Sequence, residues 1–316
     1  MSSPTGPASG LPVRMPRPRQ PGRHRRPEPA AAPAGAPPLV LAVPGTPDLT
    51  TRRHAEEILS IARSELPGLD ARIGYLDAAE QAEAGEGFPA LDAVLGHAAA
   101  QRAARGGEPR EAAAEGVEDP WERAPDAVVV PLLAGPDKAV MRRIRQAVMN
   151  SGSASELTDA LGPHPLLAEA LHVRLSEAGL ARADRARLFT VATAADGIVL
   201  ATVGGEEAVQ AAGITGMLLS ARLAVPVLAA ALDEDGGVAR AAERLRESGS
   251  RNLALAPCLI GPEVDETLPA MAAKEAGCAV AEPLGAYPAI GKLALAKYSE
   301  ALGIAPQTRT PGAQVH

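Results

Sequence analysis

Two acidic side chains stand shortly after apolar runs, where α/β proteins commonly place catalytic or metal-binding groups. Asp77 follows the run Ala71–Leu76, and Asp137 follows the run Asp126–Leu133 after a short Ala-Gly-Pro turn. If both runs are parallel strands, their carboxyl ends lie at one edge of a sheet. Two carboxylates there could form an oxygen-only metal site, which suits Mg²⁺ better than Fe²⁺ or Co²⁺. Asp137 could instead cap a helix that begins at Lys138.

His164 is the histidine whose position most suggests chemistry. It lies in the turn Leu161–Pro165, after the short predicted strand Glu156–Ala160, and so borders the same edge. A neutral imidazole there could bind a metal or accept a proton. Its two flanking prolines, at the start of a predicted helix, are also a common structural setting.

The composition and the motifs argue against several classes of function. The formal net charge is −7, so we expect no general attraction to nucleic acid or to an anionic membrane. No apolar run approaches the ~20 residues of a membrane-spanning helix. Cys258 and Cys278 are too few for a disulfide framework and too far apart for a CxxC metal site. Without a P-loop or a GxGxxG motif, we expect no nucleotide. The simplest expectation is a soluble, cytoplasmic protein.

Strand-like and helix-like segments alternate after residue 38, which predicts an α/β fold with parallel, right-handed wound sheets. The predicted strands are Leu39–Val43, Ala71–Leu76, Asp126–Leu133, Glu156–Ala160, Gly197–Thr202, Val225–Leu232 and Leu253–Ile260. The predicted helices are Thr50–Leu66, Phe88–Gln101, Lys138–Met149, Leu166–Ala178, Glu206–Leu223 and Val238–Ser248. We interpret 1–38 as a disordered basic Pro/Ala-rich tail, 102–123 as an inserted loop and 304–316 as a second tail.

The two halves of this pattern repeat each other. The segment Pro131–Asp137 (PLLAGPD) matches Pro257–Glu263 (PCLIGPE), and Leu161–Pro165 (LGPHP) matches Leu284–Pro288 (LGAYP). Two pairs of matching segments in the same order indicate a tandem duplication. The predicted halves are 39–182, which carries the insertion, and 183–303.

The repeat resembles the small class II chelatases, the sirohydrochlorin ferrochelatase and cobaltochelatase family of sirohaem and cobalamin synthesis. The features that carry this resemblance are Leu39–Val43 with the following Gly45-Thr46, Gly74–Glu80, Val128–Gly135, and Leu157–Leu171 with its weaker copy Pro283–Leu295. The resemblance covers nearly all of Leu39–Leu302. It implies two flavodoxin-like halves that face each other across a cleft for a tetrapyrrole, into which Fe²⁺ or Co²⁺ is inserted as the metal substrate.

Metal insertion needs a ligand that holds the ion at one face of the ring and a base that removes the pyrrole protons. The family's loop after the first strand usually reads GHGS, a second histidine follows the third strand, and a carboxylate ends the second. Here the first histidine position falls on Pro44, while Gly45 and Thr46 keep the rest of the loop. The second position falls at or next to Asp137, and the carboxylate becomes Asp77.

The second copy departs from the family pattern in the same way. Its equivalent positions are Val203, a residue near Leu232–Asp233, and Glu263. Neither half therefore keeps a pair of histidines.

Two functions stay open on these residues. The first is metal insertion. Under this reading Asp77, Asp137 and His164 are the catalytic groups, Asp77 and Asp137 also bind the metal, and Gly45, Thr46 and Gly135 contact the ring. The second is a non-catalytic relative that binds a tetrapyrrole, a metal or a protein partner. The basic helix Lys138–Arg145 could meet ring carboxylates or could simply be a solvated face. The sequence leaves the oligomeric state open.

Overall fold

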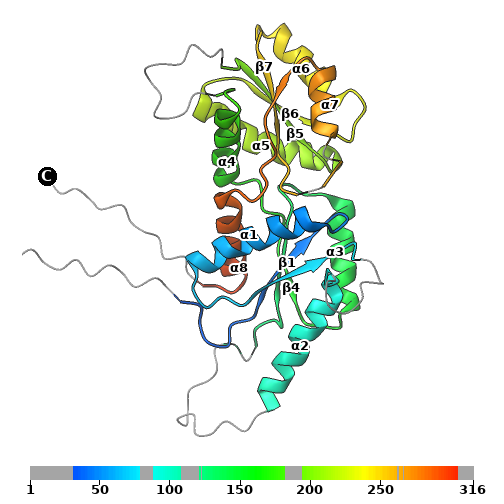
Figure 1. The fold of residues 1–316 in the computed structure, drawn as a ribbon, viewed down its shortest axis with the longest axis vertical. Helices are drawn as coiled ribbons and strands as arrows, with labels where there is room; N and C mark the ends of the chain where they lie inside the picture. The colour runs from blue at the N-terminus through cyan, green and yellow to red at the C-terminus, as the bar shows by residue number, and fades with distance from the viewer. Residues whose placement is uncertain are drawn as a thin grey trace, which may run out of the picture.

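Strands and helices alternate along the chain in the computed structural model (Figure 1). The model describes residues 31–78, 88–107, 121, 123–181, 194–261, 263–265 and 267–304. The first half contains β1 (Leu39–Val43), α1 (Leu49–Glu65), β2 (Ala71–Tyr75), α2 (Leu91–Gly107), β3 (Val128–Pro131), α3 (Lys138–Asn150), β4 (Glu156–Leu157) and α4 (Pro165–Glu177). The second contains β5 (Gly197–Thr202), α5 (Gly205–Leu223), β6 (Val227–Ala231), α6 (Gly237–Glu247), β7 (Leu253–Pro257), α7 (Leu268–Glu275), β8 (Ala279–Val280) and α8 (Pro288–Ala301).

Each half holds one four-stranded parallel sheet, and the two sheets share one topology. The strand orders are β2-β1-β3-β4 and β6-β5-β7-β8. In the first sheet Leu41 of β1 lies between Ile73 of β2 and Val130 of β3. Every residue of β1 is buried, because helices cover both faces of the sheet. The predicted duplicated, parallel α/β fold is confirmed.

Two helices cross between the halves. Helix α8, the last of the second half, packs against α1 and β3, whereas α4 of the first half packs against α5 and β7. Gly291 allows the close approach of α8 to α1, since a Cβ atom there would lie 2.6 Å from the Ile61 Cβ atom. One hydrophobic core consequently runs through both halves and includes Leu39, Leu200 and Ile290.

The ends of two predicted irregular segments belong to the ordered fold. Helix α2 continues to Gly107, so 102–107 is helical rather than part of the inserted loop; 108–120 and 122 lie outside the described residues. Of the predicted N-terminal tail, 1–30 lies outside the described residues, but Pro37 is buried and its carbonyl accepts a 2.8 Å hydrogen bond from the Tyr298 hydroxyl. No helix among the described residues is long and apolar enough to cross a membrane.

Candidate functional site

Asp77 lies just beyond the end of β2 and forms an ion pair with Arg143 of α3. Both side chains are partly exposed, at 34% for Asp77 and 49% for Arg143. The carboxylate predicted to bind a metal therefore already has a cationic partner, supplied by a helix 66 residues further along the chain.

Asp137 is the N-cap residue of α3. One of its carboxylate oxygens, Oδ1, accepts hydrogen bonds from the backbone N–H groups of Ala139 at 2.8 Å and Val140 at 3.0 Å. A carboxylate is favourable here because the first N–H groups of a helix lack partners within it. The capping interpretation of Asp137 is thus confirmed.

His164 has the matching position at the start of α4. Its Nδ1 atom accepts a 3.1 Å hydrogen bond from the backbone N–H of Leu166. Burial lowers the pKa of His164, and the nearby Lys297 cation lowers it further. A neutral ring that accepts at Nδ1 carries its proton on Nε2. In this arrangement His164 presents a donor, rather than the lone pair that a metal ligand or a base requires.

The loop after β1 contributes backbone rather than reactive side chains. Pro44 is buried, Gly45 has a positive φ of 82°, and Thr46 is exposed. The loop ends at Asp48, which forms a capping box with Thr51 at the start of α1. Neither Pro44 nor Gly45 offers a ligand or a base, in agreement with the loss of the histidine at Pro44.

The loop after β3 meets the loop after β5 at the centre of the molecule. A Cβ atom on Gly204 would lie 3.0 Å from the Asp137 Cα atom, and one on Gly135 would lie 3.9 Å from Thr202 Oγ1. Lys138 forms a 3.0 Å ion pair with Glu207 of α5. The loop after β3 in the first half is therefore in direct contact with the end of β5 and the loop after it in the second half.

Glu263 of the second half also contacts the loop after β3, through a hydrogen bond from the Ala134 N–H. Its carboxylate accepts from the backbone N–H of Ile260, with both oxygens at 3.2 Å. Burial raises the pKa of Glu263 to about 8; the N–H groups of Ile260, Gly261 and Ala134 oppose the rise, and the charge of Asp137 adds to it. Asp137 and Glu263 occupy equivalent positions in the two repeats, so the repeat predicted their equivalence but not their proximity.

The three residues predicted to be catalytic are held in separate interactions. Asp77 pairs with Arg143, whereas Asp137 and His164 each cap a different helix. Within the described ranges, no group of three or more His, Cys, Asp or Glu side chains is placed to hold a metal ion.

A pocket of about 620 Å³ lies beside the central contact, at the ends of β3 and β4. Asp137, Asp159 and three cations of α3 line it, namely Lys138, Arg142 and Arg145. Lys138 is paired with Glu207, but Arg142 and Arg145 are exposed and form no ion pair with any described residue. Neither Asp77 nor His164 lines this pocket. Of the three candidate residues Asp137 alone lines the pocket, so the basic helix Lys138–Arg145 is its clearer indication in the sequence.

A second pocket, of about 400 Å³, takes the equivalent place at the ends of β7 and β8. Asp48 and His54 of the α1 region line it, together with Asp265 and Glu282 of the second half. The two pockets thus follow the internal repeat but differ in charge: the first presents unpaired guanidinium groups, and the second presents mainly carboxylates.

No protein-family model matches the chain, and no curated protein sequence matches it. Among solved structures, the cobalt complex of the sirohydrochlorin chelatase SirB from Bacillus subtilis subspecies spizizenii is similar, with a TM-score of 0.53 and 13% identity over 85% of this chain and 96% of that one. SirB from Bacillus subtilis with Fe³⁺ has a TM-score of 0.54 and 14% identity, over 84% of this chain and 96% of that one. The chain has the class II chelatase fold. At this identity the similarity shows the fold alone.

Proposed function

We propose that this protein binds a carboxylate-bearing tetrapyrrole of the sirohydrochlorin type and does not insert a metal into it. The observation that carries the proposal is the pair of unpaired guanidinium groups, Arg142 and Arg145, in the pocket beside the central contact. The similarity to the SirB structures supports the class of ligand.

The chemistry of the pocket fits such a ligand better than a free metal ion. Arg side chains bind carboxylates through two parallel N–H···O bonds, and a sirohydrochlorin ring carries many carboxylates. The volume of about 620 Å³ falls within the range usual for small-molecule pockets. Met141 adds an apolar contact between the charged residues.

Metal insertion is the second candidate, and the specific observation in its favour is the likeness to SirB structures that contain cobalt and Fe³⁺. Asp77, Asp137 and His164 would then have to leave their present partners to act as ligands or bases. The metal, Fe²⁺ or Co²⁺, would be a substrate. The expected cytoplasmic location and the expected absence of nucleic-acid, membrane and nucleotide partners stay predictions.

Titration of the protein with sirohydrochlorin, followed by the absorbance of the ring, tests the binding proposal. We expect Arg142→Gln and Arg145→Gln each to weaken binding at least tenfold, because each variant loses a charge-assisted hydrogen bond. Arg244→Gln removes the same charge from an exposed position of α6, outside this pocket, and should change binding less than twofold. Equal effects of all three variants would refute the assignment of the pocket.

A metal-insertion assay separates the two candidates. With Co²⁺ or Fe²⁺ added, the native protein should leave the rate of absorbance change at the uncatalysed value. Turnover above that rate would overturn the binding-only proposal and establish the second candidate. The Pro44→His variant then tests whether a ligand restored after β1 is sufficient for insertion, and we expect that it is not, because Asp77 and Asp137 remain engaged.

A further inference from the structure

The outer edge of the first sheet is formed by β2. The backbone N–H of Leu39 donates to Asp70 O at 2.8 Å, and that of Leu76 donates to Val43 O at 3.0 Å. The even-numbered residues of β2 therefore direct their backbone groups toward β1. Because backbone groups alternate along a strand, Ala71, Ile73 and Tyr75 direct theirs away from the sheet.

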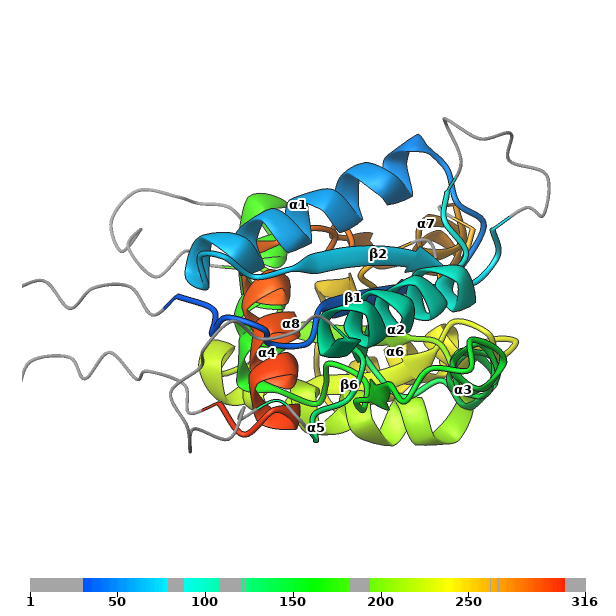
Figure 2. The same cartoon turned by 90° about the horizontal axis from the view of Figure 1, so that it is seen from below.

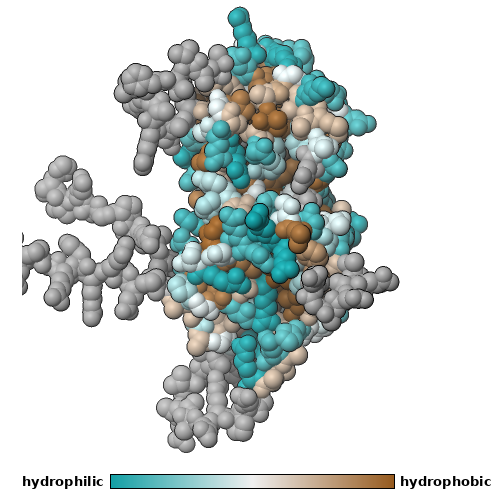
Figure 3. Space-filling model, in the orientation of Figure 1, coloured by the Kyte–Doolittle hydropathy of each residue, from teal (hydrophilic) through white to brown (hydrophobic). Residues whose placement is uncertain are grey.

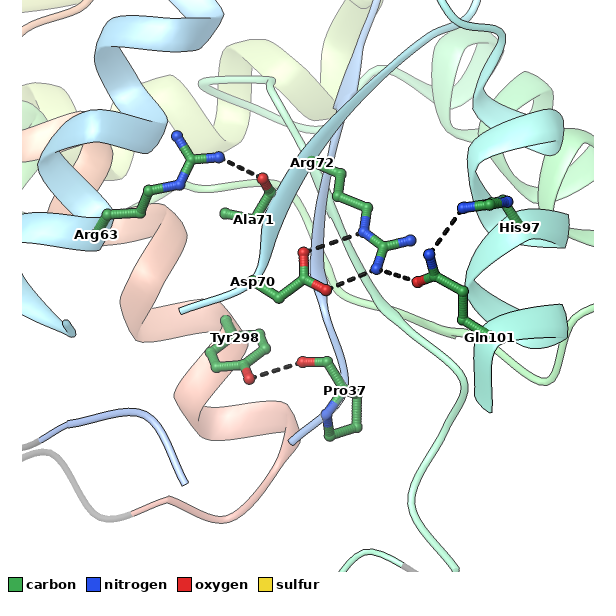
Figure 4. A network of polar contacts seen from close by, with 8 residues as sticks. All are labelled: Pro37, Arg63, Asp70, Ala71, Arg72, His97, Gln101 and Tyr298. Atoms are coloured by element: carbon green, nitrogen blue, oxygen red, sulfur yellow. Dashed lines mark hydrogen bonds and ion pairs between the residues drawn. The ribbon is translucent and has the colours of Figure 1, made fainter. Parts of the chain in front are cut away.

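Only part of this outward backbone has partners. The carbonyl of Ala71 accepts from the Arg63 guanidinium (Figure 4), and the Tyr75 N–H donates to Pro89 O at 2.9 Å. Among the described residues, no group bonds to the outward N–H and C=O of Ile73. This leaves a gap in the middle of the edge where one more strand can pair.

A groove of about 780 Å³ opens over this gap. Helix α1 forms one wall with Arg52, Leu59 and Arg63, and α2 forms the other with Val94 and His97. Figure 2 shows β2 running between these two helices. The α1 wall from Arg52 to Arg63 spans about 16 Å at 1.5 Å per residue. An extended peptide of about five residues covers the same length.

The groove has an apolar floor and a cationic rim. Hydrophobic residues show between hydrophilic ones in the middle of the face in Figure 3, and the floor includes Ile73 and Phe88. The rim carries a small excess of positive charge. Arg52 pairs with Glu56 at 2.9 Å and Arg72 with Asp70 at 2.6 Å, whereas Arg63 has no carboxylate partner among the described residues.

Of two polar groups that line the groove, one is already paired and the other is not. The guanidinium of Arg72 is held by Asp70 and by Gln101, which also contacts His97 (Figure 4). The hydroxyl of Tyr75 is buried and has no hydrogen-bond partner among the described residues, although Tyr75 lines the groove. An unpaired buried donor of this kind is costly unless a ligand satisfies it.

We infer that the groove over β2 binds an extended, acidic peptide segment of a protein partner, which adds to the sheet as a further strand. The free backbone groups of Ile73 pair with the peptide backbone, and the excess positive charge of the rim, carried by Arg63, selects its acidic side chains. The inference does not depend on the tetrapyrrole proposal, since the groove lies along the outer edge of β2 and that pocket lies at the ends of β3 and β4.

Fluorescence anisotropy with a labelled hexapeptide of alternating Val and Glu residues tests the inference. We expect saturable binding that weakens as salt is added, and at least tenfold weaker binding of the Val/Lys counterpart. Two N-methylated forms of the peptide provide the decisive comparison, one methylated on the Val nitrogens and the other on the Glu nitrogens. A peptide added to a sheet edge uses only one of its own edges, so one form should bind and the other should not.

Matched variants locate the site. Ala93→Trp fills the groove from α2 and should weaken binding at least tenfold, whereas Ala103→Trp, on an exposed part of α2 outside the groove, should change it less than twofold. Arg52→Glu should weaken binding, and Arg53→Glu, the neighbouring exposed residue outside the groove, should not.

Three results would overturn the inference. One is the absence of peptide binding at millimolar concentration, and another is equal binding of the two N-methylated forms. The third is a dimer in sedimentation that Ala93→Trp disrupts, because a second copy of the chain would then be the occupant of the groove.

Discussion

Glu263→Gln is the most informative substitution at the centre of the molecule. In the folded protein burial raises the pKa of Glu263 to about 8, compared with its ordinary value of 4.5. The folded state therefore keeps a proton that the unfolded chain releases between these two values. The stabilising effect is complete below pH 4.5 and is lost as the pH rises through 8.

The size of the effect follows from proton linkage. A carboxyl group with pKa values of about 8 folded and 4.5 unfolded loses about 2 kcal/mol of folding stability between pH 6 and pH 8. Because Glu263 is partly exposed, partial hydration reduces this loss of stability. We take about 1 kcal/mol as its lower limit. Gln has nearly the same shape and does not titrate, so this pH dependence should disappear from the variant.

Urea unfolding at pH 6, 7 and 8 measures the effect. The native protein should become less stable relative to Glu263→Gln by about 1–2 kcal/mol across this range. Glu247→Gln, an exposed carboxylate on α6, is the matched control and should follow the native pH dependence. Parallel curves for native protein and Glu263→Gln would show that Glu263 is ionised in the folded state, which would refute the reasoning that burial raises its pKa.

Four further substitutions test the local structure by urea unfolding. Gly204→Ala should cost about 3 kcal/mol, because φ is 108° and the new Cβ atom would lie 3.0 Å from the Asp137 Cα atom. Gly205→Ala, with φ of 75° and no atom within 4 Å of the Cβ position, should cost only about 1 kcal/mol. His164→Ala should cost about 1 kcal/mol through loss of the α4 cap. Asp77→Asn should cost less than about 1 kcal/mol, because its ion pair is partly exposed; a larger loss would indicate a second role.

The sheets were predictable because their signal is local. Runs such as Leu39–Val43 contain only apolar residues, as strands buried on both faces require. The parallel direction of the strands followed from their alternation with helices, and the likeness of the two halves followed from the two matched segments of the repeat; the order of the strands within each sheet was not predicted. The cap at Asp137 could also be anticipated, because an aspartate directly before the first residue of a predicted helix is a local pattern.

Longer-range features left no such signal. The exchange of α4 and α8 between the halves is invisible in the sequence, because helical periodicity shows which face of a helix is buried but not which sheet it covers. The partner of Asp77 lies 66 residues away, so no spacing rule finds Arg143. Residues 102–107 were assigned to a loop for lack of apolar periodicity, although their alanines and arginines favour a helix.

The contact between the loops after β3 and β5 explains why residues at these strand ends hold the two halves together rather than act as reactive groups. Gly204 packs against Asp137, and the carboxyl group of Glu263 accepts a hydrogen bond from the Ala134 N–H in the loop after β3. Side chains that must hold two halves together cannot also change partners freely during a reaction. A ligand that enters between the halves therefore has to meet groups outside this contact, and Arg142 and Arg145 are the cations that the contact leaves unpaired. A substitution that weakens the packing of Gly204 against Asp137 should also lower the affinity for the tetrapyrrole, although Gly204 does not line the pocket that holds Arg142 and Arg145.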